Sequence, residues 1–461
     1  MDTIDLNRWA IYFVFGVPFL AWVLFTQRNP FRLIAVVAIL IFVQRSFATR
    51  RYLWAIGVGP SVMVAYTAFI GLFLVRRRLP TLGVAAAAWG AFLFFALTAM
   101  LVGSLRGPTE LLWNFHAFQE LYLEGFLFFL IGAMAFTRDD ELREFFTLLM
   151  IVGFLVAVAH YFCLSTGYRF PDFGESADEV RQFLYGGFFT NVNSQGCFYA
   201  MTLPIALSLV LSRLVSPAVR VLAAVSLVAM IGSLLLSWHR GGFIVTSLMV
   251  LIVIFSGGLR PSRAFVVVTG VALAALAGYF LALNLLPDTF ARILETKGAQ
   301  GLETERWTFW QMYIPVIVSH PFGVGLTAPI VLEVAREAGI PVVPHNIYMN
   351  MALQTGFVGL FAFLAVVGAV VFQNLRAWRR VLDPRRRQLL LQLFVAVSAF
   401  LLVGLAEPVY DNGQKLNNFF WLMCGISLST SFRMLAEARR DRAESVVAAH
   451  GPFEQYPAPG L

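Results

Sequence analysis

Residues 346–373 read NIYMNMALQTGFVGLFAFLAVVGAVVFQ, a run of 28 residues without one charged side chain. About 20 mostly apolar residues in an α-helix suffice to cross the hydrocarbon core of a bilayer. A strand of a membrane barrel would instead alternate polar and apolar residues over about ten positions. The run is therefore predicted to form a transmembrane helix.

Similar runs recur along the whole chain of 461 residues, and the composition agrees with them. Hydrophobic residues make up 59% of the chain and charged residues only 13%, whereas soluble domains carry about 25% charged residues. Too few polar side chains remain to cover a soluble fold, which predicts an all-α polytopic membrane protein with about 12 or 13 transmembrane helices. The expected spans are residues 9–25, 31–44, 53–75, 81–103, 119–136, 145–163, 194–212, 220–237, 241–259, 264–286, 346–373, 389–406 and 418–435.

The composition also excludes other classes of protein. The net charge is +8, but the basic residues sit in short runs between apolar segments, so nucleic acid is not an expected partner. The three cysteines, Cys163, Cys197 and Cys424, lie in or beside apolar segments at no short spacing. They therefore indicate neither a disulfide framework nor a metal site.

Clusters of Lys and Arg mark cytoplasmic loops and so orient the spans. The clusters from residue 76 onward alternate consistently and place segments 104–118, 164–193, 238–240, 287–345 and 407–417 on the outer side. Segment 287–345 is the longest, and it is expected to carry interfacial helices. Simple alternation also puts Arg45, Arg50 and Arg51 outside, so either segment 31–44 does not span or these arginines act at the outer face.

The chain divides into four parts on this basis. Residues 1–193 hold the N-terminal spans and an acidic outer loop, and residues 194–373 hold further spans and the long outer loop. Residues 374–435 form the C-terminal spans, and residues 436–461 are expected to be a disordered cytoplasmic tail.

The middles of the spans from residue 81 onward contain almost no ionisable side chain. Transporters usually place such groups near the membrane midplane, where substrate and ions bind. Here the polar residues lie at the outer ends of the spans, which favours an enzyme or a receptor at the outer surface over a carrier.

The first candidate site is the outer turn of residues 237–242, Ser-Trp-His-Arg-Gly-Gly. Gly241 and Gly242 allow a tight reversal, and Arg240 is expected at the level of the lipid head groups. An arginine that merely snorkels at a helix end is the alternative interpretation. An outer-face arginine departs from the orientation rule, however, and an anionic ligand would account for it.

The second candidate site is residues 303–326, ETERWTFWQMYIPVIVSHPFGVGL. Arg306, Trp307 and Trp310 fall on about one face of a helix, and the stretch closes with a Pro-x-Gly-x-Gly turn at residues 321–325. An interfacial amphipathic helix is predicted. A helix that only packs on the membrane surface is the alternative.

The third candidate site is Pro344-His345-Asn346, directly before a span. Asn346 is suited to cap that helix, and His345 would lie at its start, where a neutral imidazole can act as a base. A histidine that fills a polar interfacial position is the alternative. The free N–H groups of the helix could also bind phosphate.

Taken in this order, the three features resemble the O-antigen ligase/polymerase superfamily. They are the outer Ser-x-x-Arg-Gly turn, the long outer loop whose Arg/Trp helix ends in Pro-x-Gly-x-Gly, and the His-Asn that opens the next helix. The resemblance covers roughly residues 190–365. It includes the Asn-x-Asn of residues 191–193 and the glycine-spaced run of residues 356–360.

The resemblance implies a multi-pass glycosyltransferase of the bacterial inner membrane, with its active site on the periplasmic side and with no cofactor. Members of this superfamily transfer a glycan from an undecaprenyl-diphosphate carrier to a sugar hydroxyl. In ligases the acceptor is lipid A–core, and in polymerases it is another lipid-linked repeat unit. The expected partners are therefore that donor, a lipid A–core or glycan acceptor, and membrane lipids.

The leaving group of this reaction is a diphosphate, which requires electrostatic stabilisation as the glycosidic bond breaks. No carboxylate pair or metal motif stands out in the sequence, so no metal site is predicted. Arg240 and Arg306 are assigned to the diphosphate and His345 to the proton of the acceptor hydroxyl. The supporting residues are Asn346, Trp310, Ser237 and Gly241.

Two other classes of function remain. A lipid-linked-sugar flippase or polysaccharide transporter would share the hydrophobicity, but it would line its path with buried charges. A non-catalytic receptor would account for the loops. It would not predict that two arginines and a histidine from three outer segments converge.

Overall fold

The structure, a computed structural model, is helical through most of the chain that it describes. It describes residues 69, 73, 80–166, 189, 192–212, 214–237, 239–256, 269–270, 304–340, 344–407 and 416–450, without the side chains of residues 108, 192, 304–306, 328 and 446–450. No strand occurs in these ranges, which confirms the all-α class. In chain order the helices are α5 (Val84–Ser104), α6 (Pro108–Ala117), the π-helix η4 (Phe118–Leu123), α7 (Glu124–Ala135), α8 (Asp139–Thr166), α10 (Val192–Leu211), α11 (Pro217–Leu236), α12 (Arg240–Ser256), α15 (Thr304–Ser319), α16 (Ala328–Glu337), α17 (Ile347–Arg380), α18 (Pro384–Val403) and α19 (Leu416–His450).

The helices agree with the apolar runs of the sequence. Within the described ranges, eight helical stretches are long and apolar enough to cross a membrane, and α12 is a shorter apolar helix of 17 residues. Each of these coincides with an expected span, which confirms a polytopic membrane protein. The expected spans 9–25 and 31–44 lie outside the described residues. Of the spans 53–75 and 264–286, only residues 69, 73, 269 and 270 are described.

One prediction for a polar segment is wrong in part. Segment 436–461 was expected to be disordered, yet α19 continues to His450, because residues 436–444 are strong helix formers. Residues 451–461 lie outside the described part. Segment 104–118, which was placed on the outer side, contains α6, which starts with Pro108 at its first position and runs through η4 into α7.

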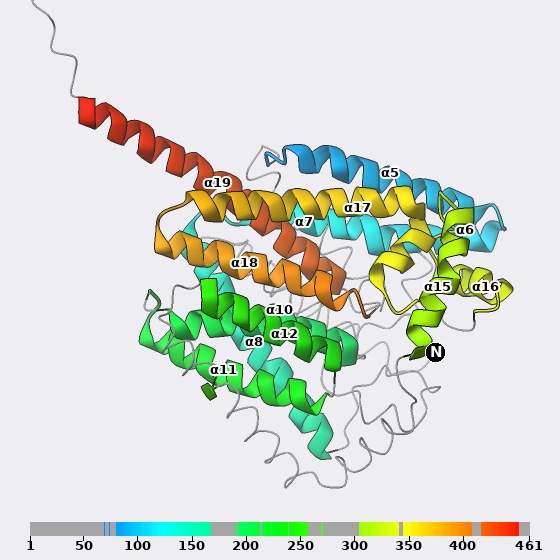
Figure 1. Cartoon of the computed structure of the whole chain (residues 1–461), viewed down its shortest axis with the longest axis horizontal. Coiled ribbons are helices and arrows are strands. Elements are labelled where there is room, and N and C mark those ends of the chain that lie inside the picture. The colour runs from blue at the N-terminus through cyan, green and yellow to red at the C-terminus, as the bar shows by residue number, and fades with distance from the viewer. Residues whose placement is uncertain are drawn as a thin grey trace, which may run out of the picture.

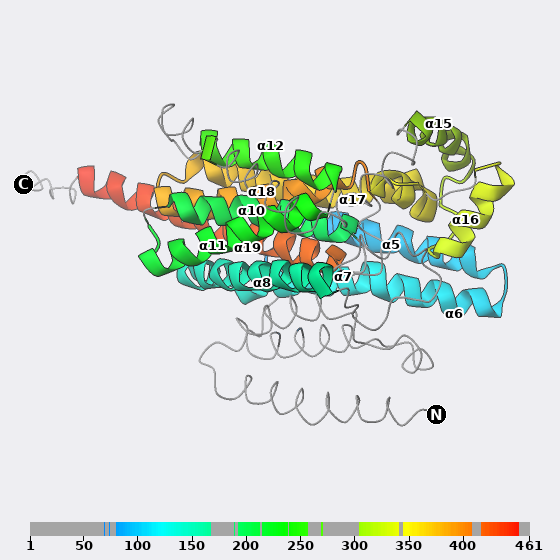
Figure 2. The same ribbon diagram turned by 90° about the horizontal axis from the view of Figure 1, so that it is seen from below.

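The helices form an elongated bundle with two distinct ends (Figures 1 and 2). At one end, here called the tail end, α19 runs out past the other helices. At the opposite end, here called the head end, lie α15, α16 and α6. Helices α10, α12, α17 and α19 begin at the head end, and α8, α11 and α18 finish there.

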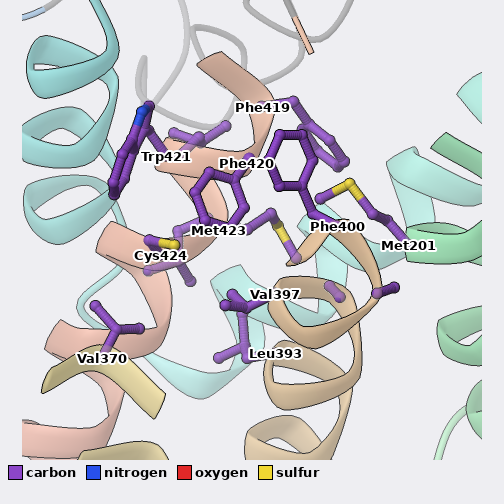
Figure 3. Close-up of a cluster of buried hydrophobic side chains, with 14 of the residues drawn as sticks. Met201, Val370, Leu393, Val397, Phe400, Phe419, Phe420, Trp421, Met423 and Cys424 are labelled. Atoms are coloured by element: carbon purple, nitrogen blue, oxygen red, sulfur yellow. The ribbon is translucent and has the colours of Figure 1, made fainter. Parts of the chain in front are cut away.

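Helices α10, α17, α18 and α19 supply one cluster of the buried core (Figure 3). Phe400 on α18 stacks on Phe420 on α19, with ring centroids 4.2 Å apart. Lipid tails are as apolar as these side chains, so close packing rather than exclusion from water holds the helices together. The labelled members of the cluster are Met201, Val370, Leu393, Val397, Phe400, Phe419, Phe420, Trp421, Met423 and Cys424.

Two glycines allow the backbones of α7 and α19 to approach closely. A Cβ atom on Gly132 would lie 2.3 Å from the carbonyl oxygen of Leu422, and one on Gly425 would lie 2.0 Å from that of Phe129. Small residues serve this purpose at helix contacts in membranes. The pair α7–α19 therefore forms a tight central contact of the bundle.

Ion pairs join α8, α18 and α19 at the tail end. Arg386 lies 2.9 Å from Glu437 and 3.2 Å from Asp139, and Arg433 lies 2.6 Å from Asp139. The tail end also carries most of the arginines in the described ranges. Those beyond the network are Arg138, Arg143, Arg220, Arg376, Arg379, Arg380, Arg385, Arg387, Arg439, Arg440 and Arg442.

At the head end, α17 is kinked at Gly356, and the turn that follows α15 fits into the kink. Gly356 has φ +74°, and a Cβ atom there would lie 1.8 Å from the carbonyl oxygen of Pro321. Gly323 has φ +83°, and the N–H of Val324 donates to the carbonyl of Leu353 at 2.9 Å. The Pro-x-Gly-x-Gly motif thus docks the α15–α16 segment against α17.

We expect Gly356→Ala to destabilise the fold by about 2–5 kcal/mol, because the new methyl group must adopt a left-handed conformation in space that Pro321 occupies. Thermal unfolding of the detergent-purified protein measures the effect. The matched control is Gly368→Ala in the same helix, where a Cβ atom would meet nothing within 4 Å. Its midpoint should stay the same or rise slightly. Equal midpoints for the two variants would contradict the docking of the turn into the kink.

Candidate functional site

A buried glutamate at the head end contacts two segments that are far apart in the sequence. Glu407 follows the end of α18 and is 6% exposed. Its Oε2 atom accepts a hydrogen bond from the side-chain amide of Asn193 in the first turn of α10. Its Oε1 atom lies 3.7 Å from Nε2 of His239. One carboxylate therefore contacts both the start of α10 and the segment that joins α11 to α12.

His239 caps α12 and places Arg240 at the first position of that helix. Its buried Nδ1 atom accepts the N–H of Gly242 at 2.9 Å, as an N-cap side chain does. A Cβ atom on Gly196 or Gly242 would lie 2.0 or 2.5 Å from Nδ1, so both glycines make room for the ring. Arg240 is exposed, at a helix N-terminus that favours anions.

The turn between α11 and α12 is shorter than predicted, and Ser237 and Gly241 make the following local contacts. Ser237 is buried, and its hydroxyl donates to the carbonyl of Leu234 at 2.7 Å, which helps to end α11. A Cβ atom on Gly241 would lie 3.6 Å from the ring of His239, an ordinary contact. Of the two glycines predicted to allow a tight reversal, Gly242 is the one at which the close approach excludes a side chain. Trp238 lies outside the described residues.

Asn346 caps α17, as predicted from the sequence. Its Oδ1 atom accepts the N–H groups of Tyr348 at 2.8 Å and Met349 at 3.1 Å. His345 precedes it and is half-buried. The imidazole therefore lies at the start of α17, where the positive end of the helix dipole favours the neutral ring.

The start of α17 is attached to the end of α18. The side-chain amide of Asn346 donates to the carbonyl of Leu405 at 2.8 Å, and the N–H of Ile347 donates to the carbonyl of Gly404 at 2.8 Å. Glu407 is only two residues beyond Leu405. The segment that carries His345 and the segment that carries Arg240 thus both contact residues 404–407.

Helix α15 packs on the first turns of α17. Tyr313 and Phe309 of α15 cluster with Met349 and Leu353 of α17, and burial raises the pKa of Tyr313 to about 12. Trp310 is half-buried, with its ring 6.2 Å from that of the exposed Trp307. Arg306 lies one turn before Trp310, and its side chain lies outside the described part of the structure.

Further polar side chains lie inside the bundle, beyond the residues of the candidate site. Ser233 of α11 hydrogen-bonds His160 at 2.6 Å and Tyr199 at 2.8 Å. On the other side, Asn418 of α19 donates to the buried Glu124 at 2.7 Å. Glu124 directly follows the π-helix η4, a type of element that often occurs at functional sites. Buried polar side chains therefore lie near the head end, and others, among them Glu141, Gln373, Asn374 and Gln392, lie buried toward the tail end.

The structure brings some of the predicted residues together and adds others. His345, Asn346 and Arg240 come from elements that meet at residues 404–407. Sequence reasoning did not assign Glu407 or His239 to the site, and it noted Asn193 only as part of a motif. The available signal was an acidic residue directly after an apolar span, Glu407 followed by Pro408.

The described residues include no group of three His, Cys, Asp or Glu side chains arranged to hold a metal ion. Glu303 and Asp411, together with the side chain of Glu305, lie outside these residues. Among the described residues, the cations and hydrogen-bond donors of the head end are groups that could neutralise an anionic ligand.

These features define a polytopic, all-α membrane protein whose candidate site lies at one end of the helix bundle. Residues 225–364 match the family model described as O-antigen ligase. This match confirms the resemblance to the O-antigen ligase/polymerase superfamily, and with it a glycosyltransferase-like function of the ligase/polymerase type. The matched residues include Ser237, Arg240, Arg306 and the His345-Asn346 pair. Among curated proteins, none matches the chain.

Proposed function

We propose that the protein transfers a glycan from an undecaprenyl-diphosphate carrier to an acceptor sugar hydroxyl, and that the head end of the bundle is its active site. The observation that carries this proposal is the attachment of the Arg240 and His345 segments to the same four residues, 404–407. Residues 194–373 then form the catalytic region.

Arg240 and Arg306 bind the donor diphosphate in this proposal. Arg240 is exposed at the N-terminus of α12, where a guanidinium and free backbone N–H groups can bind phosphate oxygens together. Arg306 lies in the first turn of α15, which packs near the start of α17. Two cations at these positions stabilise the diphosphate as the glycosidic bond breaks.

His345 accepts the proton of the acceptor hydroxyl. It is half-buried at the start of α17, so its ring can stay neutral and still be reached by a substrate. Trp310 and Trp307 of α15 have flat rings that suit packing against a sugar or an isoprenoid. Glu407 is buried, and its carboxylate is held by Asn193, so it is a poor alternative as the base.

The head end faces the periplasm of a bacterial inner membrane in this proposal. Support comes from the arginines at the ends of α17 and α19 and at the starts of α8, α11 and α18, which all gather at the tail end. Excess Lys and Arg mark the cytoplasmic side. The carrier diphosphate lies at head-group depth, which is where Arg240 would meet it.

An in-frame deletion tests the function and separates its two forms. Loss of the ladder of glycan-bearing lipopolysaccharide, with lipid-linked glycan still made, is expected for a ligase that uses lipid A–core. A collapse of the ladder to single repeat units, or loss of exopolysaccharide, is expected for a polymerase. Accumulation of the lipid-linked glycan on the cytoplasmic side would instead indicate a flippase and contradict the proposal.

We expect transfer by the purified protein to survive chelation, because arginines rather than a metal ion neutralise the leaving diphosphate. The measurement compares transfer rates in EDTA and in added magnesium or manganese. Equal rates are the predicted result. A requirement for the added ion would contradict the assignment and direct attention to Glu303, Glu305 and Asp411 as oxygen ligands.

A further inference from the structure

The end of α18 connects the two halves of the proposed active site. Gly404 and Leu405 accept hydrogen bonds from Ile347 and Asn346 at the start of α17, next to His345. Two residues later, the Glu407 carboxylate contacts the cap of α12. This short segment is therefore a direct physical connection between the proposed base and the proposed diphosphate-binding helix.

The contacts of Glu407 require two acceptor atoms. Asn193 donates its side-chain N–H to Oε2. His239 accepts the Gly242 N–H at Nδ1, so its own ring proton is on Nε2, the atom 3.7 Å from Oε1. This Nε2 atom is buried and makes no hydrogen bond to the described residues, and the Glu407 carboxylate faces it. A carboxylate offers an acceptor to each donor, and an amide offers only one.

Two glycines make room for the His239 ring. Gly196 of α10 and Gly242 of α12 both lie against Nδ1 at distances that exclude a side chain. The His239 ring is packed between α10 and α12 and faces the Glu407 carboxylate. A shift of Glu407 would therefore also move the residue that follows His239 in the sequence. That residue is Arg240.

We propose that Glu407 is a positioning residue that acts through His239 to set Arg240 at a fixed distance from His345. This inference rests on the proposed function, because it concerns how the donor and acceptor halves of that site are aligned. Glu407 itself does not touch the reacting atoms. Its role is to hold a geometry in which an error of about 1 Å costs about 100-fold in rate.

The first test is Glu407→Gln, which keeps the size of the side chain but replaces the carboxylate by an amide with a single oxygen, so that the Asn193 amide must turn over or lose its acceptor. We expect kcat/KM for the lipid-linked glycan to fall about 10- to 100-fold, with the KM for this donor raised. The protein should remain folded and in the membrane. Asn374→Ala is the matched control, because Asn374 is a buried residue with two hydrogen bonds, to Leu390 and Ser427, nearer the tail end. It should lower the thermal midpoint and leave the donor KM unchanged.

The second test is the double variant Asn193→Asp with Glu407→Gln, which exchanges the carboxylate and the amide between the two positions. The new carboxylate at position 193 can accept from the new amide at position 407, and the oxygen of that amide stays available to His239. We expect this exchange to recover most of the donor KM that Glu407→Gln loses. A residue with only a general role in folding would not show a donor-specific recovery.

Three outcomes of these tests decide whether Glu407 positions Arg240. Recovery in the double variant supports the positioning role. A wild-type donor KM in Glu407→Gln, while Arg240→Ala abolishes transfer, overturns the inference and leaves the proposed function standing. Wild-type transfer by Arg240→Ala removes Arg240 from the site and overturns the inference with it, and the in-frame deletion then judges the proposed transfer function separately.

Discussion

Replacing Arg240 or Arg306 by alanine is expected to lower glycan transfer by at least about 10³-fold without reducing the amount of protein in the membrane. Each change removes a cation from the diphosphate at the moment when that group gains charge. Arg240 is exposed at the start of α12, and Arg306 belongs to a helix that packs beside the start of α17. Transfer of a labelled lipid-linked glycan in isolated membranes measures the effect.

Lysine at either position should restore activity only in part. A lysine ammonium is a point charge, and it cannot grip two phosphate oxygens in the planar, paired manner of a guanidinium. Arg336→Ala is the control, because Arg336 is an exposed arginine of α16 at the same end of the bundle and has no assigned role. Wild-type transfer by Arg240→Ala or Arg306→Ala would remove that arginine from the site.

His345→Ala is expected to lower the transfer rate by about 10²–10⁴-fold, which is the usual contribution of a positioned general base. A sugar hydroxyl is a poor nucleophile until its proton is removed. The arginines remain in this variant, so binding of the donor should persist. Binding of radiolabelled undecaprenyl diphosphate and single-turnover transfer separate the two effects.

The matched control for this change is His320→Ala. His320 lies in the same long segment, and its ring contacts only its own neighbourhood, Val316 and Ser319, in the hydrogen bonds observed. It should transfer glycan at the wild-type rate. Loss of donor binding in His345→Ala would make His345 a binding residue. Full activity would instead support the alternative interpretation, a histidine that only fills a polar interfacial position.

The spans could be predicted from the sequence because each is a single apolar run with its own signal. Their ends were harder to place. Helix α17 was expected to finish at residue 373 and continues to Arg380, because Asn374 and Ala377 are buried on its inner face. Helix α8 was expected to begin at residue 145 and begins at Asp139, whose carboxylate pairs with Arg386 and Arg433. Such partners come from distant parts of the chain.

The candidate site could be predicted only where its contacts are local in the sequence. The cap formed by Asn346 depends on its neighbours along the chain, and it is confirmed. Glu407 was not identified, because its partners Asn193 and His239 lie more than 160 residues before it. Gly196 shows the limit most clearly, since only the fold reveals that the His239 ring occupies the space beside it.

The central claim is that the head end breaks the bond between a glycan and its lipid diphosphate carrier. The most direct test places the purified protein in lipid vesicles with an undecaprenyl-diphosphate-linked oligosaccharide and lipid A–core, and follows free undecaprenyl diphosphate and the acceptor together. The predicted result is one molecule of released carrier for each glycan transferred, with neither product formed by Arg240→Ala. The claim would be contradicted if intact lipid-linked oligosaccharide moved across the vesicle membrane and no carrier were released. This must hold both with lipid A–core and with a second lipid-linked repeat unit as the acceptor.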